Sequence, residues 1–160
     1  MKRHPDLRPL SEDHHTALVL ARRTRRAAER GGDDAGALDA QWRDVVRAFA
    51  AELEPHFATE ERWMLPRLEE SGETRLVERT RADHARLREL VRDAASAPVL
   101  AEFAALLERH VRFEERELFV RFEALLTEYE DASMRGLCRE GAWEAAIGAL
   151  RSARRNAQRD

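Results

Sequence analysis

One helical pattern occurs twice in this chain of 160 residues, and paired positions are 54 residues apart. The first copy contains His56 and Glu60, and the second contains His110 and Glu114. Residues four apart lie one turn above each other on one face of an α-helix, so each copy presents an imidazole and a carboxylate to the same point. A fold that brings these two helices together would create a site for metal.

The rest of the sequence predicts helices separated by short breaks, without convincing strand alternation. We expect four long helices, over residues 11–30, 37–70, 73–95 and 98–129. Ser11 is the expected N-cap of the first helix, and Pro55 should kink or restart the second. Long helices with short connections favour an all-α fold, an up-down-up-down four-helix bundle.

A shorter fifth helix is expected near the C-terminus, over residues 132–153. It carries Trp143, Ile147 and Leu150, which would cap the bundle or meet a second subunit. We therefore expect residues 1–130 to form the bundle and residues 131–160 to form an extra C-terminal helix of the same domain. The expected oligomeric state is a monomer or a weak homodimer.

Charge and composition narrow the class of protein. The 28 Lys and Arg residues nearly balance the 31 Asp and Glu residues, which leaves a formal net charge of -3. We therefore expect neither nucleic acid nor a membrane as a partner. The single cysteine, Cys138, cannot form an internal disulfide, and the N-terminal residues lack the apolar stretch of a secretion signal. The expected compartment is the cytoplasm.

Each of the four expected bundle helices carries at least one histidine. The candidate ligands are His14 or His15, His56 with Glu60, His84, and His110 with Glu114. Inward imidazoles and carboxylates on four helices are what a metal centre in a bundle core requires. These donors suit iron or manganese, and zinc or copper would compete with those metals for the site.

The first helix offers two adjacent histidines, which point about 100° apart and cannot both face inward. Three apolar residues stand at i+3, i+4 and i+7 from His14, whereas Arg22 stands at i+7 from His15. An aspartate precedes His14, as another precedes His84. These patterns favour His14 and leave His15 as the alternative.

Residues 10 to 130 resemble the hemerythrin-like proteins with the HHE cation-binding domain. The histidines and glutamates occur in the family's order, and the segment from Glu60 to Leu68, EERWMLPRL, looks like the family's Glu-Glu-x-x-Leu-Phe-Pro-x-Leu. The resemblance implies a non-haem di-iron centre inside a four-helix bundle. It also implies that Glu60 and Glu114 bridge the two irons and that the histidines are shared between them.

Two positions depart from the oxygen-carrying members of that family. Those carriers have a second histidine one turn after the one that matches His84, where this chain has Arg88. They also place the last carboxylate five residues after its histidine, which would select Glu115. The i+4 spacing favours Glu114, with Glu115 as the alternative. Both departures weaken the case for reversible oxygen carriage and leave iron binding intact.

The sequence is compatible with three functions. The first is a di-iron binding protein that senses or handles dioxygen, nitric oxide, peroxide or iron. The second is a di-iron oxidoreductase with peroxidase-, catalase- or ferroxidase-like activity, so enzymatic turnover stays open. The third is a helical interaction domain without metal. If the chain has such a metal site, we expect burial to raise the pKa of Glu60 and Glu114 in the metal-free protein. We also expect iron binding to raise the melting temperature.

Overall fold

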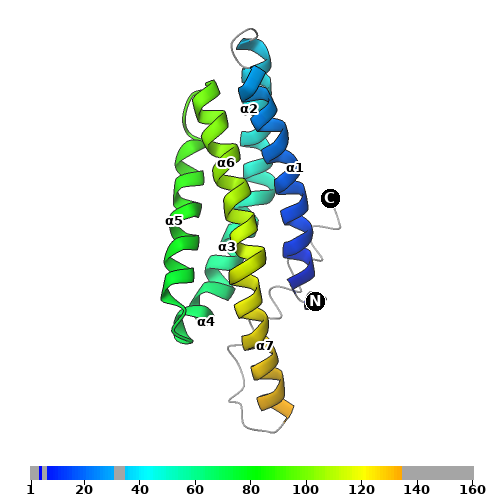
Figure 1. Cartoon of the computed structure of the whole chain (residues 1–160), viewed down its shortest axis with the longest axis vertical. Helices are drawn as coiled ribbons and strands as arrows, with labels where there is room; N and C mark the ends of the chain where they lie inside the picture. Colours follow the sequence, from blue (N-terminus) through cyan, green and yellow to red (C-terminus); the bar gives the residue numbers. More distant parts are fainter. Residues whose placement is uncertain (1–3, 5–6, 31–34, 135–160) are drawn as a thin grey trace.

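A computed structural model describes residues 4, 7–30 and 35–134, and in these ranges the chain is built of helices. In chain order the elements are α1 (Arg8–Arg30), α2 (Ala35–Ala48), η2 (Phe49–Leu53), α3 (Glu54–Thr59), η3 (Glu60–Met64), α4 (Leu65–Glu70), α5 (Thr74–Leu90), α6 (Ala97–Phe113), η4 (Glu114–Leu118) and α7 (Phe119–Met134). The elements α2 to α4 form one continuous helix, and α6 to α7 form another. Figure 1 shows the resulting four long helices side by side, alternating in direction. The predicted all-α, up-down-up-down bundle is confirmed.

The helix starts follow local capping in one case and tertiary contact in another. Ser96 is the N-cap of α6, where its hydroxyl accepts a hydrogen bond from the Val99 N–H at 3.3 Å. Helix α1 instead begins at Arg8, so Ser11 lies inside its first turns. The Ser11 hydroxyl donates to Glu115 Oε1 at 2.7 Å. The prediction that Ser11 is an N-cap is therefore wrong, because the side chain binds a distant carboxylate.

Three segments of the long helices widen into π-helical turns, and the sequence analysis did not predict them. In the first, η2, the Glu54 N–H donates to Phe49 O, five residues back. The backbone stays helical there, and a new α-helical segment, α3, starts at Glu54 with Pro55 in its first turn, as the sequence predicted. The other two segments, η3 and η4, begin at Glu60 and Glu114. Single π turns are rare in proteins, and those that occur are often found at functional sites.

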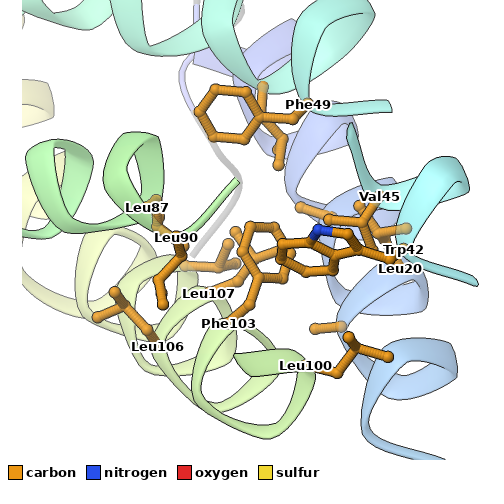
Figure 2. Packing of buried hydrophobic residues seen from close by; sticks show 14 of the residues in the cluster. Leu20, Trp42, Val45, Phe49, Leu87, Leu90, Leu100, Phe103, Leu106 and Leu107 are labelled. Atoms are coloured by element: carbon orange, nitrogen blue, oxygen red, sulfur yellow. The ribbon is translucent and has the colours of Figure 1, made fainter. Parts of the chain in front are cut away.

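Two apolar clusters fill the bundle, one toward each end. The larger joins α1, α2, η2, α5 and α6, and the smaller joins the start of α1 to η3, α4, η4 and α7. Figure 2 shows part of the larger cluster, in which Trp42 and Phe103 meet edge to face with ring centroids 5.6 Å apart. On α1 and α5 the predicted histidine lies between residues of the two clusters. On the other two long helices, Phe57 and Val111 of the larger cluster follow the histidine directly, and the smaller cluster begins beyond the glutamate. The candidate site is thus enclosed from both ends.

Two predicted boundaries differ from the structure. Helix α5 ends at Leu90, before residue 95, and α7 continues to Met134 without the break that we expected after residue 129. The predicted fifth helix lies almost entirely outside the described residues, as do Trp143, Ile147 and Leu150. None of the helices in the described ranges is long and apolar enough to cross a membrane.

Replacing Phe103 by alanine should lower the free energy of unfolding by about 3–5 kcal/mol, because it removes a fully buried ring and leaves a cavity beside Trp42. Urea unfolding of the metal-free protein, followed by circular dichroism, measures this change. Val120→Ala, at an exposed position of α7, is the control and should change stability by about 0.5 kcal/mol or less. Equal effects of the two substitutions would contradict this placement of Phe103.

Candidate metal centre

The structure brings six predicted side chains together at the middle of the bundle. They come from α1 (His14), α3 (His56), η3 (Glu60), α5 (His84), α6 (His110) and η4 (Glu114). All six are buried, and both carboxylates are fully excluded from solvent. His15 is exposed on the outer face of α1. Of the two candidates on the first helix, His14 is therefore the one that reaches the cluster.

The six side chains form two groups, each with two imidazoles and two carboxylates. One group contains His14 and His56, and the other contains His84 and His110; Glu60 and Glu114 belong to both. Within each group, one ligand atom from every residue lies within 4.8 Å of the others. This spacing suits two metal ions held side by side by shared carboxylates.

Each shared carboxylate directs one oxygen to each group. Glu60 Oε1 lies 3.3 Å from His56 Nε2, and Glu60 Oε2 lies 3.3 Å from His84 Nε2. Glu114 shows the same division: its Oε2 lies 3.1 Å from His14 Nε2 and its Oε1 lies 3.0 Å from His110 Nε2. This is the arrangement that a carboxylate needs to bridge two ions.

The second nitrogen of every imidazole faces a further carboxylate. The pairs are His14 Nδ1 with Glu115 Oε1 at 2.7 Å, His84 Nδ1 with Glu61 Oε1 at 2.7 Å, His56 Nδ1 with Asp13 Oδ2 at 3.2 Å, and His110 Nδ1 with Asp83 Oδ2 at 3.5 Å. A carboxylate can only accept, so each pair favours a proton on Nδ1 and leaves Nε2 for a metal. Glu115 therefore lies outside the cluster that Glu114 enters.

These contacts repeat with an approximate two-fold symmetry between the first and second halves of the chain. His56 and His110 each face an aspartate from their own half, Asp13 and Asp83. His14 and His84 each face a glutamate from the opposite half. The sequence duplication is therefore also a duplication of the site, with the two shared carboxylates between the halves.

Several buried polar atoms at the centre have no hydrogen-bonding partner. They are both carboxylate oxygens of Glu60 and of Glu114, Nε2 of His84, and both ring nitrogens of His110. Neighbouring nitrogens lie at ion-pair distances but lack hydrogen-bond geometry. On the other side of the site, His14 Nε2 and His56 Nε2 point at each other at 3.1 Å. Burying such atoms without partners is costly, and a cation between them would satisfy them. The residues fit a metal.

The histidines carry raised pKa values when no metal is included. Burial lowers the pKa of His84, but the nearby carboxylates of Glu114, Glu60 and Glu61 outweigh it and raise the pKa to about 11. Burial also lowers the pKa of His56, but the charge of Glu60 and the hydrogen bond to Asp13 raise it to about 10. Both imidazoles are therefore protonated at neutral pH in the metal-free protein.

The same pairing lowers the pKa of both glutamates. Burial raises the pKa of Glu114, but the charge of His110 and the nearby imidazoles of His14 and His84 bring it well below its usual value. Burial and the charge of Glu114 raise the pKa of Glu60, and His56 and His84 reverse this effect. The expectation that burial alone sets these pKa values was wrong, because protonated imidazoles supply positive charge where a metal is missing.

Aromatic rings close off part of the site. Phe57 stacks on His84 with ring centroids 3.9 Å apart and meets His110 edge to face at 5.4 Å. Phe119 stacks on His14 at 4.9 Å. These rings hold the imidazoles in place and keep water from the two groups.

A small cavity reaches three of the histidines, His14 and His56 of one group and His110 of the other. Its volume is about 10 Å³, roughly the space that one water molecule needs. Ala17 and Leu53 are among its apolar walls. Ala17 stands three residues after His14, whereas the matching position after His84 is the fully buried Leu87. This cavity was not predicted from the sequence, although the small residue at that spacing indicates it.

Arg88 does not enter the cluster. Its guanidinium binds two carboxylates, Glu61 and Glu54. The hydrogen bond from His84 and that from Arg88 lower the pKa of Glu61 to about 2 against the opposing effect of burial. The position at which oxygen carriers have another histidine is thus occupied here by a residue that supports the site from outside.

The comparison with known families agrees with this geometry. The model of the hemerythrin HHE cation-binding domain matches residues 6–122. The chain belongs to this family. No match was found among curated proteins or among solved structures. Cation binding by the hemerythrin domain and the buried His/Glu cluster together support a metal site in this chain.

Loading this hemerythrin domain with Fe²⁺ should release protons, because a metal must displace the protons on His56 and His84. At least two protons per chain are expected at pH 7.5, since both pKa values lie near 10 or above and the pKa values of His14 and His110 are raised as well. Anaerobic calorimetry in buffers of different ionisation enthalpy counts them. Metal affinity should rise with pH, and loading without proton release would contradict these pKa shifts.

The stability of the metal-free domain should fall as the pH rises, whereas its metal affinity should rise. The folded-state pKa values of His56 and His84 lie above the unfolded value near 6.5, so their contribution to stability is complete below pH 6.5 and is lost as the pH rises through about 10. The melting temperature should therefore fall between pH 7 and 10. The chain has a single tyrosine, a single cysteine and a single lysine, so few other groups titrate in this interval.

Proposed function

We propose that this chain is a non-haem di-iron protein that senses or handles dioxygen, reactive oxygen or nitrogen species, or iron itself. The observation that carries the proposal is the pair of His₂Glu₂ groups that share both carboxylates. The proposed ligands are His14, His56, Glu60, His84, His110 and Glu114. The proposed compartment is the cytoplasm; this, together with a monomeric or weakly dimeric state, stays a prediction from sequence.

The donor set supports iron over the alternatives. Imidazole nitrogen and carboxylate oxygen suit iron and manganese, and zinc is a possible substitute. Four protein donors for each ion leave coordination positions free, since iron accepts up to six. When bound, a di-iron centre supplies exchange between Fe²⁺ and Fe³⁺ and open positions for a small ligand. The buried carboxylates and imidazoles bind and orient the ions.

The surroundings of the site favour a small ligand. The cavity beside His14 and His56 has room for little more than a diatomic molecule. Its small size and its apolar walls, which include Ala17 and Leu53, exclude charged metabolites from it. Dioxygen, nitric oxide and peroxide are therefore the proposed ligands.

A second function, that of a di-iron oxidoreductase, is favoured by one specific contact. Asp13 lines the same cavity, and its side chain is 50% exposed to solvent. Its Oδ2 lies 3.2 Å from His56 Nδ1. A carboxylate that touches both solvent and the edge of the site can carry a proton between them, as peroxide or ferroxidase chemistry requires.

Anaerobic loading with Fe²⁺ should give two irons per chain and raise the melting temperature, because the ions bind the folded state alone. Glu114→Ala removes a carboxylate from both groups and should abolish binding of at least one iron. Glu117→Ala, at an exposed position of the same segment η4, is the control and should load normally. Metal analysis and differential scanning calorimetry measure both effects. Unchanged iron content in Glu114→Ala would contradict the proposed site.

Exposure of the loaded protein to oxygen separates the two functions. A visible absorption band that disappears again on removal of oxygen supports binding. Sustained consumption of peroxide or of added Fe²⁺ supports the oxidoreductase, and Asp13→Asn should then slow turnover while iron content stays the same.

Ala17→Leu should fill the cavity with the side chain that the second half carries at Leu87. Association of nitric oxide with the ferrous protein should slow by about tenfold, since a ligand must then displace a packed methyl group at a cost of order 1 kcal/mol. Stopped-flow spectroscopy measures this rate. Ala105→Leu, at an exposed position of α6, is the control. An unchanged rate in Ala17→Leu with both irons present would show that the ligand does not use this cavity.

A further inference from the structure

A surface hollow lies between α1 on one side and the end of α2 with η2 on the other. Its volume is about 130 Å³. Thr16, Val19 and Leu20 line it from α1, and Ala48 and Leu53 line it from α2 and η2. Val19 is 40% exposed, so an apolar side chain meets solvent here. The hollow therefore offers apolar surface to a small molecule in solution.

Two buried residues line both this hollow and the cavity at the metal centre. They are Ala17 and Leu53, which are 3% and 5% exposed. In the cavity they lie with His14, His56 and His110. A single layer of side chains therefore separates the surface hollow from the space beside the proposed metal ligands.

This layer is apolar, and Leu53 is the member that can move. Ala17 contributes a single methyl group, whereas Leu53 carries a longer side chain that is not branched at Cβ and so is less restricted about χ1 than valine or isoleucine. A change of rotamer at Leu53 can open the layer without movement of the backbone. Arg23 and Glu52 line the hollow but not the cavity, so a charged ligand would lose its hydration at the layer without gaining a partner there.

The backbone that carries Leu53 has a feature that metal binding does not explain. Of the three π-helical segments in the described part of the chain, η3 and η4 begin at Glu60 and Glu114, whereas η2 contains none of the proposed ligands. Leu53 is the last residue of η2, three positions before His56. A π turn holds more residues than an α-helical turn, so it rotates the side chains that follow relative to those before it. The π segment without a ligand thus lies at the wall of the cavity.

Asp13 marks a second approach to the cavity, and its chemistry is different. It lines the cavity, and its side chain is 50% exposed. A carboxylate attracts protons and polar molecules. Dioxygen and nitric oxide are uncharged and weakly hydrated, so they gain from apolar surface instead. The hollow and Asp13 therefore suit different species.

We propose that the hollow between α1 and η2 is the entry site for uncharged diatomic gases, and that Leu53 is the gate that admits them past Ala17 to the metal centre. The inference rests on the proposed function, because the gas must bind at that centre. It gives a role in ligand entry to Val19 and Leu53, which are not among the proposed metal ligands.

The full-length, metal-free protein tests the gate without iron. Dissolved dioxygen is paramagnetic, so it speeds the NMR relaxation of the methyl groups that it approaches. Under oxygen pressure, the methyl groups of Ala17 and Leu53 should relax several-fold faster than those of Ala21 and Leu87, which are even more deeply buried, at 1% and 0% exposure. Val19→Trp fills the hollow with a large ring and should remove this difference.

Nitric oxide binding to the ferrous protein tests the route by its rates. Val19→Trp obstructs the hollow without lining the cavity, so association and dissociation should both slow by about tenfold and the equilibrium affinity should stay the same. Leu53→Ala shortens the gate and should speed association. Val120→Trp, at an exposed position of α7, is the control and should leave both rates unchanged. Metal analysis establishes that the compared proteins hold equal amounts of iron.

The outcomes separate this inference from the function on which it rests. Ferrous protein that binds neither nitric oxide nor dioxygen overturns the proposed function, and the relaxation of the metal-free protein still decides whether gas passes Leu53. Equal relaxation at Ala17, Leu53, Ala21 and Leu87, or unchanged nitric oxide rates in Val19→Trp, overturns the entry route alone. A changed affinity with unchanged association in Val19→Trp does the same, because the effect then lies at the binding site and not on the path. Faster relaxation at Ala17 and Leu53, together with equal slowing of both rates, supports the route.

Discussion

The burial of two carboxylates at the centre of an apolar bundle is the constraint on which the rest of this structure depends. Glu60 and Glu114 are fully excluded from solvent and lie between two apolar clusters. Carboxylates in such a place require compensating positive charge, either from protons on the surrounding imidazoles or from metal ions. The lowered pKa values of both glutamates show that the imidazoles fill this role when metal is absent. Metal and protons therefore compete for one arrangement of side chains.

The duplicated helical pattern explains how a short chain builds this arrangement. In each copy, two successive glutamates start a π-helical segment, and the first of them points into the centre. The second, Glu61 or Glu115, reaches the histidine of a helix from the other half. Neighbouring residues on a helix point about 100° apart, so one pair of glutamates can serve an inner and an outer position at once. The two halves thereby depend on each other's carboxylates.

Helical spacing was sufficient to predict the fold and to bring six candidate residues to one place, because side chains one turn apart share a face whatever surrounds them. Contacts between distant segments could not be read in this way. Ser11 matched a local capping pattern, yet it binds Glu115, which is 104 positions away in sequence. The π turns and the protonation of the histidines likewise follow from tertiary packing. The structure was needed to decide between His14 and His15, and between Glu114 and Glu115, because it shows which side of each helix faces inward.

The two halves of the site differ in the residues that follow His14 and His84. Ala17 and Leu18 follow His14 at the positions where Leu87 and Arg88 follow His84. Ala17 lines the cavity that His14, His56 and His110 share, while Arg88 binds Glu61, the carboxylate that accepts a hydrogen bond from His84. The matching position after His84 is the fully buried Leu87, so no small residue opens the packing there. Two adjacent positions on α1 and α5 thus make the surroundings of His14 and His84 unequal, although the two histidines contact the shared glutamates in similar ways.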